Sequence, residues 1–274
     1  MNRLARQVQI MIHKAYSNQI YDTAIIGGGI LGLWAARHAT KRGEKVVLIE
    51  KRKIGAGASG GFLGALMPHM PDGWDAKKQF QYGGLSTLSD AIAELQSDTG
   101  HDCDYRMCGR IMPLTHEKML QHMPVRVKGA DKFWVDGYDM SLLKAENFPS
   151  DWINPDIAEF GVQYDTFSAR INPRAYLSAL EAYVRPRCEI LEGLECVEIL
   201  PEVGQVTLSN GDKILAGKII VANGYEAYPL LQPFMGAMNN EKPIGRGVKG
   251  QAVLVEYKHN DDLPIVYHDG SYIH

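Results

Sequence analysis

The sequence lacks any long hydrophobic run, because a charge or a glycine interrupts every apolar stretch within about ten residues, whereas a membrane-spanning helix needs ~20. Cysteine is also scarce. Cys103, Cys108, Cys188 and Cys196 form no CxxC pair and no zinc-ligand spacing, which excludes a disulfide framework and predicts a protein without a metal. The resulting expectation is a location in the reducing cytoplasm.

An excess of charge of one sign is missing as well. Lys and Arg number 29 and Asp and Glu 32, so the net charge is −3 at pH 7. Nucleic acid is therefore not expected as a main partner, because wrapping its backbone needs a basic surface. Residues 1–20 contain no Asp or Glu, and no apolar core or small-residue cleavage site follows them. We interpret them as an N-terminal extension, with a weak amphipathic targeting helix as the alternative.

What the sequence does contain is a globular composition, with 45% hydrophobic residues over 274 positions. This length suits one large domain or two interwoven ones. A βαβ unit is predicted near its start. An apolar segment at residues 21–26 is followed by a helical pattern at 30–42, a glycine at position 43, and a second apolar segment at 45–50.

Gly27, Gly29 and Gly32 form a GxGxxG pattern between the first predicted strand and the helix. In a dinucleotide site the first glycine permits the turn, the second lets the pyrophosphate reach the backbone, and the third lets helix and strand pack closely. The helix that begins at Ile30 turns its free N–H groups toward the phosphates. Glu50 ends the second strand, where a carboxylate accepts hydrogen bonds from ribose hydroxyls. A glycine-rich turn without a ligand is the alternative interpretation.

The segment after the second strand bears on which dinucleotide is bound. Residues 54–66 are too rich in glycine for a stable helix, whereas a nicotinamide dehydrogenase would usually continue with a further helix and strand. A loop that lies along an extended flavin dinucleotide fits this pattern, so FAD is the predicted cofactor. Lys51 and Arg52 could instead hold the 2′-phosphate of NADP, but Glu50 would repel that phosphate. A solvated strand end is the other interpretation of the two cations.

The patterns farther along the chain are less regular. Residues 75–99 have a helical pattern toward their end, whereas no helical period persists through 103–170, which suits an antiparallel region. Asn172 and Pro173 predict the start of a helix that runs to about residue 184. Short strands are predicted at 189–191, 196–200, 206–208, 213–215 and 218–224, with the turn at 209–212 closing a hairpin.

Five segments together resemble the D-amino-acid oxidase (DAO) family of FAD enzymes, and its glycine oxidase branch in particular. They are the Ala-Ser…Gly-x-Leu loop at 55–66, the Gly-x-Leu strand at 108–114, the helix start at 171–174, the apolar strand at 219–224, and a Val-Arg-Gly-Gln-like segment at 248–251. Their order is that of the family over about residues 21–274. Asn223 and Lys249 replace the usual Ala and Arg.

The end of the sequence departs further from the family pattern. Members of the family continue from the strand near His274 into a second FAD segment and the Arg that usually binds the substrate carboxylate. The resemblance therefore implies an amino-terminal portion of an oxidase. A second copy of the chain or a partner chain would complete such a fold.

The resemblance implies an α/β fold with two interleaved domains. A Rossmann-like FAD-binding domain is expected at residues 21–100 and 171–230, and an antiparallel α+β substrate domain at 101–170 and 231–274. The residues expected to contact FAD are Gly27, Gly29, Ile30, Leu31, Gly32, Glu50, Lys51, Ala58, Ser59, Gly64, Ala65, Leu66, Val197, Ala222 and Gly224.

The activity implied by the resemblance is oxidation of the C–N bond of a small amino acid or secondary amine, of the glycine, D-amino acid or sarcosine type. Hydride passes to the flavin, and dioxygen or another electron acceptor reoxidises it. His69 follows the flavin loop and is expected to face the flavin or the substrate. Arg110, flanking Cys108 together with Arg106, is expected to bind the substrate carboxylate. Ordinary core or surface roles are the alternatives for these side chains.

Two rival functions stay open. Residues 57–68 also resemble the loop of a tRNA-modifying oxidase that acts on a modified uridine, although the sequence lacks the basic excess expected for such a partner. The second rival is an inactive FAD-binding remnant. The substrate, the electron acceptor and the oligomeric state do not follow from the sequence.

Overall fold

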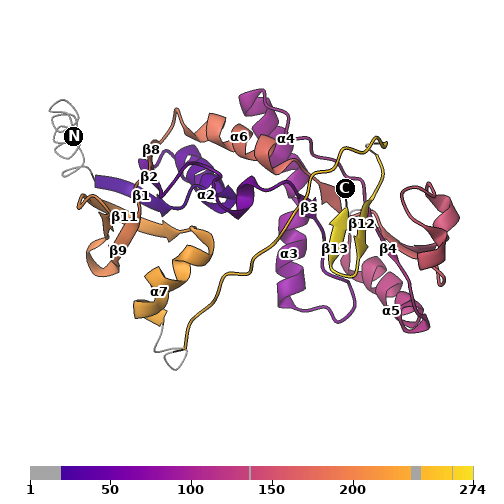
Figure 1. Cartoon of the computed structure of the whole chain (residues 1–274). Helices are drawn as coiled ribbons and strands as arrows, with labels where there is room; N and C mark the ends of the chain where they lie inside the picture. Colours follow the sequence, from indigo (N-terminus) through magenta and orange to yellow (C-terminus); the bar gives the residue numbers. More distant parts are fainter. Residues whose placement is uncertain (1–19, 136, 236–241, 261, 274) are drawn as a thin grey trace. The chain divides into compact units, whose positions relative to one another are not determined.

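The computed structural model describes residues 20–135, 137–235, 242–260 and 262–273, and Figure 1 shows its helices and strands. The chain folds into two compact units. Unit 1 consists of Met1–Gly61, Asp98–His101 and Pro173–Ala252, and unit 2 of Phe62–Ser97, Asp102–Asn172 and Val253–His274. Of the predicted extension at 1–20, all but the last residue lies outside the described part of the chain.

A six-stranded sheet forms the centre of unit 1, in the order β8-β2-β1-β11-β10-β9. The strands are β1 (Ile20–Ile26), β2 (Val46–Glu50), β8 (Glu189–Glu192), β9 (Cys196–Leu200), β10 (Gln205–Leu208) and β11 (Lys213–Val221). The first four strands of this order are parallel, whereas β10 and β9 add on in antiparallel fashion. Ile25 in β1 pairs with Leu48 on one side and Ile220 on the other, so apolar residues flank the central strand on both sides within the sheet.

The helices of unit 1 include α2 (Ile30–Lys41), α6 (Pro173–Val184) and α7 (Ala227–Met235), with single turns η1 (Ala58–Gly60), η4 (Pro201–Val203) and η5 (Gly224–Glu226). Helices α2 and α6 pack against each other. The indole N–H of Trp34 donates to the Tyr176 hydroxyl at 2.6 Å, and the buried guanidinium of Arg37 pairs with Asp98 at 2.8 Å. These contacts fix α2 after the glycine turn.

The predicted βαβ unit and hairpin are confirmed by this sheet. β1, α2 and β2 follow one another as expected, and β10 pairs with β11 across the turn at 209–212. The segments predicted as two strands, 213–215 and 218–224, form the single strand β11, which ends at Val221. Gly217 lies within that strand, and its backbone faces Asp22 of β1, so the glycine accommodates close strand packing rather than a break.

A five-stranded sheet lies in unit 2, in the order β13-β12-β4-β6-β5. β4 runs parallel to β12, while the other neighbours in this sheet are antiparallel. β3 and β7 form a separate antiparallel pair. The strands are β3 (Ala65–Leu66), β4 (Arg110–Pro113), β5 (Met140–Leu143), β6 (Val162–Asp165), β7 (Ala169–Arg170), β12 (Ile265–His268) and β13 (Ser271–Ile273).

The helices of unit 2 confirm one expectation and correct another. They are α3 (Ala76–Ser86), α4 (Leu88–Thr99, whose last two residues belong to unit 1) and α5 (Glu117–Phe133), with turns η2 (Ala145–Asn147) and η3 (Pro155–Ile157). The helical pattern expected toward the end of 75–99 is present as α4, and α3 precedes it. The two helices are separated at Thr87, whose hydroxyl donates to the Gly83 carbonyl. The expectation that 103–170 has no persistent helix is wrong over α5. Pro124 and Gly129 interrupt its sequence pattern, yet Met123 and Ala130 are buried in an aromatic core.

The two units differ from the predicted boundaries mainly in two segments. Residues 62–97, expected in the first domain, belong to unit 2, where β3 pairs with β7. Residues 231–252, expected in the second domain, belong to unit 1. There α7 contacts β9, and Leu230 packs on the sheet core. Within the described ranges, no helix is long and apolar enough to cross a membrane.

Candidate functional site

The glycine turn lies at the carboxyl end of β1, beside the ends of β2 and β11. Gly27 N donates to the Ile49 carbonyl at 2.8 Å, and Ala222 N donates to the Ile26 carbonyl at 2.7 Å. Gly27 has φ +110°, and a Cβ atom there would stand 2.6 Å from the Ala222 carbonyl oxygen. Glycine is therefore required at this position both for its conformation and for the close approach of β11.

Gly29 and Gly32 have different neighbours. Gly29 is the residue before α2, and a Cβ atom there would lie 3.1 Å from the Ser59 hydroxyl oxygen. At Gly32 a Cβ atom would overlap the Gly27 carbonyl oxygen. Gly32 thus lets the helix pack against the turn. Gly29, which has no side chain, leaves the space in front of the helix N-terminus open. No acidic residue occupies the first turn of α2, so its positive end is available to an anion.

The loop after β2 returns to the glycine turn. Gly55 N donates to the Gly28 carbonyl at 3.0 Å, and Ile30 N donates to the Ser59 hydroxyl at 3.1 Å. Arg174 Nε of α6 donates to the Gly60 carbonyl at 3.0 Å. These bonds hold η1 against the start of α2, and place Ala58 and Ser59 at the site.

Glu50 is fixed at the end of β2 by two backbone amides. Its Oε2 atom accepts from Gly28 N at 2.7 Å and its Oε1 atom from Arg52 N at 2.8 Å. Each carboxylate oxygen has a second lone-pair direction, so the side chain can still accept from a ligand. The carboxylate is therefore held in place before any ligand arrives.

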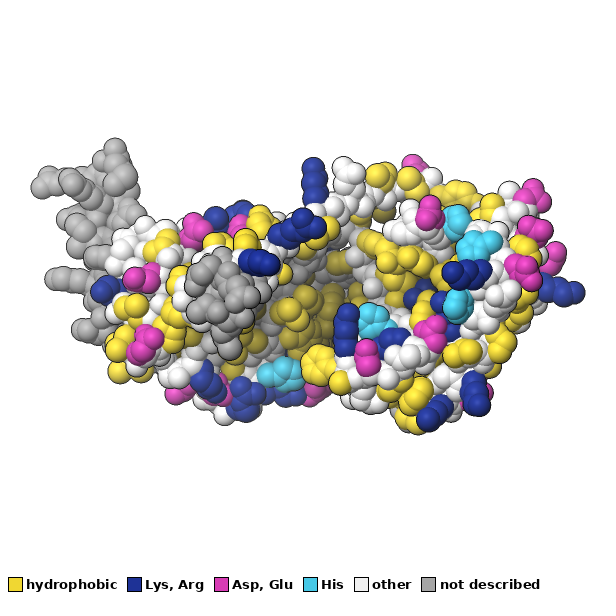
Figure 2. Space-filling model, turned by 90° about the horizontal axis from the view of Figure 1, so that it is seen from below, with side chains coloured by type: hydrophobic (Ala, Val, Ile, Leu, Met, Phe, Trp, Pro, Cys, Tyr) yellow, Lys and Arg dark blue, Asp and Glu magenta, His cyan; other side chains and the backbone are white. Residues whose placement is uncertain are grey.

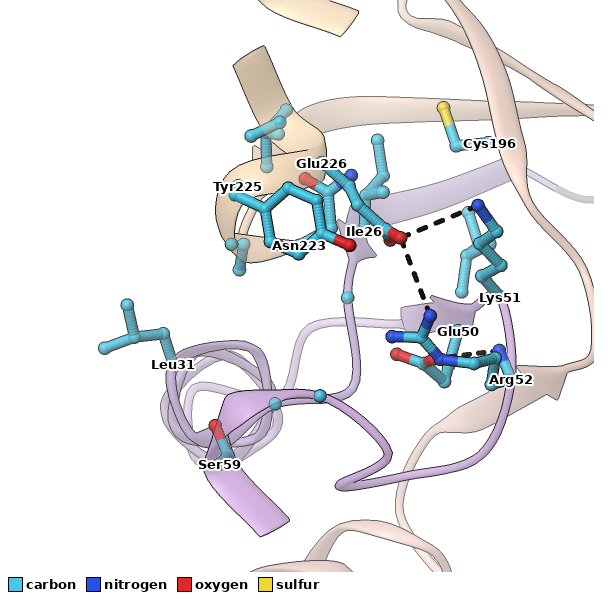
Figure 3. Close-up of a pocket in the computed structure, with 18 of the residues that line it drawn as sticks. Ile26, Leu31, Glu50, Lys51, Arg52, Ser59, Cys196, Asn223, Tyr225 and Glu226 are labelled. Atoms are coloured by element: carbon cyan, nitrogen blue, oxygen red, sulfur yellow. Dashed lines mark hydrogen bonds and ion pairs between the residues drawn. The ribbon is translucent and has the colours of Figure 1, made fainter. Parts of the chain in front are cut away.

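These segments enclose a cavity of about 390 Å³ within unit 1, in the size range of small-molecule sites. Figure 3 shows its lining residues coming from the glycine turn, the end of β2, η1 and the turn after β11. Ten predicted cofactor residues line it. They are Gly27, Gly29, Ile30, Leu31, Glu50, Lys51, Ala58, Ser59, Ala222 and Gly224.

The other predicted cofactor residues have different places. Gly32 lies behind the turn, as described. Val197 is 53% exposed, and its neighbour Cys196 lines the cavity instead, because successive side chains of a strand point to opposite faces. Burial raises the pKa of the Cys196 thiol to about 11, so this wall is uncharged. Gly64, Ala65 and Leu66 belong to unit 2, where Gly64 O accepts from Ile171 N at 2.9 Å.

Several lining residues were not predicted as ligand contacts. They are Ile26, Ile49, Arg52, Gly57, Glu195, Cys196, Val221, Asn223, Tyr225, Glu226 and Ala227. Four of them could have been predicted, because they come directly after an apolar parallel strand, where ligands of α/β sheets bind. These four are Asn223, Tyr225, Glu226 and Ala227. Glu195 precedes β9, and only the fold brings it to the cavity.

Four charged side chains join at the mouth of the cavity. Lys51 Nζ lies 3.0 Å from Glu195 Oε1 and 3.6 Å from Glu226 Oε1, and Arg52 lies 3.6 Å from the same Glu226 oxygen. Figure 3 shows Glu226 facing both cations. The hydrogen bond to Glu195, followed by the charge of Glu226, raises the pKa of Lys51.

The predicted catalytic side chains lie in unit 2. His69 is half-buried, and its backbone N donates to Gln81 Oε1 at 2.7 Å. Arg110 is only 5% exposed, and its Nε donates to Asp165 Oδ2 at 2.8 Å. Asp165 is itself buried and accepts from Ser168. The charge of Arg110 is therefore neutralised inside unit 2. Arg106, by contrast, is half-exposed and pairs with Asp104 at 3.5 Å.

Metal chemistry has no visible site in the part of the chain that is described: no group of three or more His, Cys, Asp or Glu is placed to hold an ion. The four cysteines are free. The charges at the described cavity are those of the α2 N-terminus and of the side chains of Glu50, Lys51, Arg52, Glu195 and Glu226.

Comparisons with known proteins agree with this architecture. The uncharacterized oxidoreductase YurR of Bacillus subtilis is 27% identical over 219 residues, which cover 76% of this chain and 56% of YurR. The crystal structure of glycine oxidase from Geobacillus kaustophilus matches with TM-score 0.69 and 21% identity, over 81% of this chain and 59% of that one. L-proline dehydrogenase from P. horikoshii matches with TM-score 0.65 and 18% identity, over 92% and 65%.

The chain thus spans a little over half the length of YurR, 56%. The structural matches identify the α/β fold with a Rossmann-like domain that the sequence predicted. The family model described as DAO, FAD dependent oxidoreductase, matches residues 22–274. Because that match covers nearly the whole sequence, the chain belongs to the DAO family of FAD-dependent oxidoreductases.

Proposed function

We propose that unit 1 is the FAD-binding domain and that its cavity holds the adenosine diphosphate half of FAD. The observation that carries this proposal is the cavity at the carboxyl ends of β1, β2 and β11, bounded by Gly27, Gly29 and the fixed carboxylate of Glu50. Dinucleotides bind at this place in doubly wound α/β sheets. The glycine backbone would face the pyrophosphate, and the N-terminus of α2 would stabilise its charge.

The residues around the cavity have separate roles in this proposal. Glu50 would accept hydrogen bonds from the adenosine ribose hydroxyls through its remaining lone pairs. Ser59 would hold η1 against the helix start through its bond to Ile30 N. When bound, FAD would supply the hydride acceptor for oxidation of a C–N bond. The protein then has to position the amine, exclude water and hold the substrate carboxylate.

We further propose that the substrate is a small amino acid or secondary amine and that unit 2 is the substrate domain. Similarity to a glycine oxidase and to an L-proline dehydrogenase supports this substrate class. Dioxygen or another electron acceptor would complete the cycle. Membership of the DAO family makes the chain an FAD-dependent oxidoreductase, and the amine substrate is our proposal.

His69 and Arg110 differ in what their surroundings allow. His69 is on a loop held to α3 by Gln81, which accepts from His69 N and donates to the Met67 carbonyl at 3.3 Å. We keep His69 as the candidate that faces flavin or substrate. We assign no carboxylate contact to Arg110, because its guanidinium is buried against Asp165.

The tRNA-modifying alternative has less support. On the face in Figure 2, basic side chains are interspersed with acidic and apolar ones rather than gathered into one surface. A nucleic acid site needs such a basic surface. The net charge of −3 over the whole chain also argues against a nucleic acid partner.

The experiment that tests the proposed reaction measures amine oxidation by the full chain with added FAD. Peroxide release and reduction of an artificial electron acceptor are followed with glycine, sarcosine, D-alanine and D-proline. We expect substrate-dependent turnover with at least one of them, and a loss of most of it at subsaturating FAD in Glu50→Ala. Glu202→Ala, on the exposed turn η4, is the matched control. Failure of all four amines in a flavin-loaded chain would contradict the substrate class, and an unchanged Glu50→Ala would contradict the role of Glu50.

A further inference from the structure

Two cations follow Glu50 at the mouth of the cavity, and their state determines which nucleotides the cavity accepts. Dinucleotide sites that take a 2′-phosphate use an Arg near the end of the second strand. Lys51 and Arg52 stand at that place, since both line the cavity directly after Glu50. If they were unpartnered, they would supply two positive charges to a 2′-phosphate on the adenosine ribose.

The structure gives both cations carboxylate partners from distant parts of the sequence. Lys51 lies 3.0 Å from Glu195, which precedes β9, and both cations lie 3.6 Å from Glu226 on η5. Glu226 is the least exposed of the four, with 24% of its side chain accessible against 40% for Lys51 and 48% for Arg52. Figure 3 shows Glu226 directed at the two cations.

The charges at the mouth of the cavity therefore disfavour the binding of a 2′-phosphate there. Glu50, Glu195 and Glu226 carry three negative charges against the two positive charges of Lys51 and Arg52. A single exposed ion pair contributes little. Here, however, one carboxylate holds both cations that could bind the phosphate. A 2′-phosphate would have to displace Glu226 from both partners and would then face Glu50.

We propose that Glu195 and Glu226 determine the ligand class of the cavity, by neutralising Lys51 and Arg52 so that it accepts adenine dinucleotides with free ribose hydroxyls and rejects 2′-phosphorylated ones. The inference rests on the proposed function of unit 1 as a dinucleotide site. Glu195 and Glu226 thus have a role in specificity although they lie outside the glycine motif. Lys51 and Arg52 are ion-paired within unit 1, which the sequence left open.

The test compares two probes that differ only in the 2′-phosphate, ADP-ribose and 2′-phospho-ADP-ribose, by calorimetric titration of the full chain purified without flavin. The wild-type chain should bind ADP-ribose at least about tenfold more tightly, the ratio expected from ~1.4 kcal/mol. In Glu195→Gln/Glu226→Gln the affinity for the 2′-phosphorylated probe should rise by about tenfold, while that for ADP-ribose changes by less than about threefold.

Two controls isolate the cause. Adding Lys51→Gln and Arg52→Gln to the double variant should remove the gain, because the released cations are then absent. Glu198→Gln/Glu202→Gln makes the same change in net charge on exposed positions of unit 1 and should leave the ratio unchanged. Thermal melts by circular dichroism verify that each variant is folded.

The outcomes separate this inference from the proposed function. If FAD and ADP-ribose bind but the double variant keeps the wild-type ratio, or if the control pair changes the ratio equally, the inference is wrong and the dinucleotide site stands. If the folded wild-type chain binds neither FAD nor ADP-ribose, the proposed function fails and the inference fails with it. A wild-type chain that prefers the 2′-phosphorylated probe would also overturn the inference.

Discussion

Substituting alanine at Gly27 should destabilise unit 1 by several kcal/mol, although it adds only one methyl group. Gly27 has φ +110°, and the new Cβ atom would stand 2.6 Å from the Ala222 carbonyl oxygen and 2.7 Å from its carbon. Left-handed backbone costs an L-residue about 1–2 kcal/mol, and overpacking adds about 1–3 kcal/mol. The sum, about 2–5 kcal/mol, is a large part of the ~5–15 kcal/mol that usually stabilises a domain.

Gly43 provides the matched control in the same unit. It also has a positive φ, +76°, but a Cβ atom there would meet nothing within 4 Å. Gly43→Ala should therefore cost only the backbone contribution, about 1–2 kcal/mol. Urea unfolding followed by circular dichroism gives both values from the transition midpoints. Equal losses for Gly27→Ala and Gly43→Ala would refute the reasoning, because the contact with β11 would then have no measurable cost.

Two further predictions concern charges in the described part of the chain. Asp165→Asn should destabilise unit 2 by about 3–5 kcal/mol, because it leaves the buried guanidinium of Arg110 without its counter-charge; urea unfolding measures this, and a loss below about 1 kcal/mol would contradict it. Hydrogen bonds from Lys218, Thr23 and Arg42 lower the pKa of Glu44 from 4.5 to about 2. Its charged form therefore stabilises the fold above pH ~4.5, and this contribution is lost as the pH falls toward 2. The stability difference between wild type and Glu44→Gln should shrink over that window, and a difference independent of pH would contradict the assignment.

The parts of the fold that sequence could predict are those where local pattern and tertiary structure agree. The strand, glycine turn, helix and second strand at residues 21–50 follow one another without insertions, and the acid at position 50 falls at the strand end. The hairpin of β10 and β11 is equally local. In each case a change of hydrophobic period and a turn residue mark the boundary.

The parts that sequence missed depend on contacts between distant residues. α5 contains Pro124 and Gly129, which weaken any helical pattern, and the helix is stabilised by burying Met123 and Ala130 rather than by propensity. Lys51 contacts Glu195, 144 positions later in the sequence, only because β8 and β9 bring the chain back to the cavity. Arg110 was expected at a substrate, but the register of β4 and β6 pairs it with Asp165.

The central claim, that unit 1 binds FAD, is tested most directly by the flavin content of the purified full chain after incubation with FAD and gel filtration. The account predicts absorption near ~450 nm that is released on denaturation, at about one flavin per chain. Gly29→Val should lose it, because its side chain would fill the space facing Ser59. Gly83→Ala, on an open face of α3, should keep it. A colourless wild-type chain that takes up no added FAD, or a folded Gly29→Val that retains the full flavin content, would contradict the account.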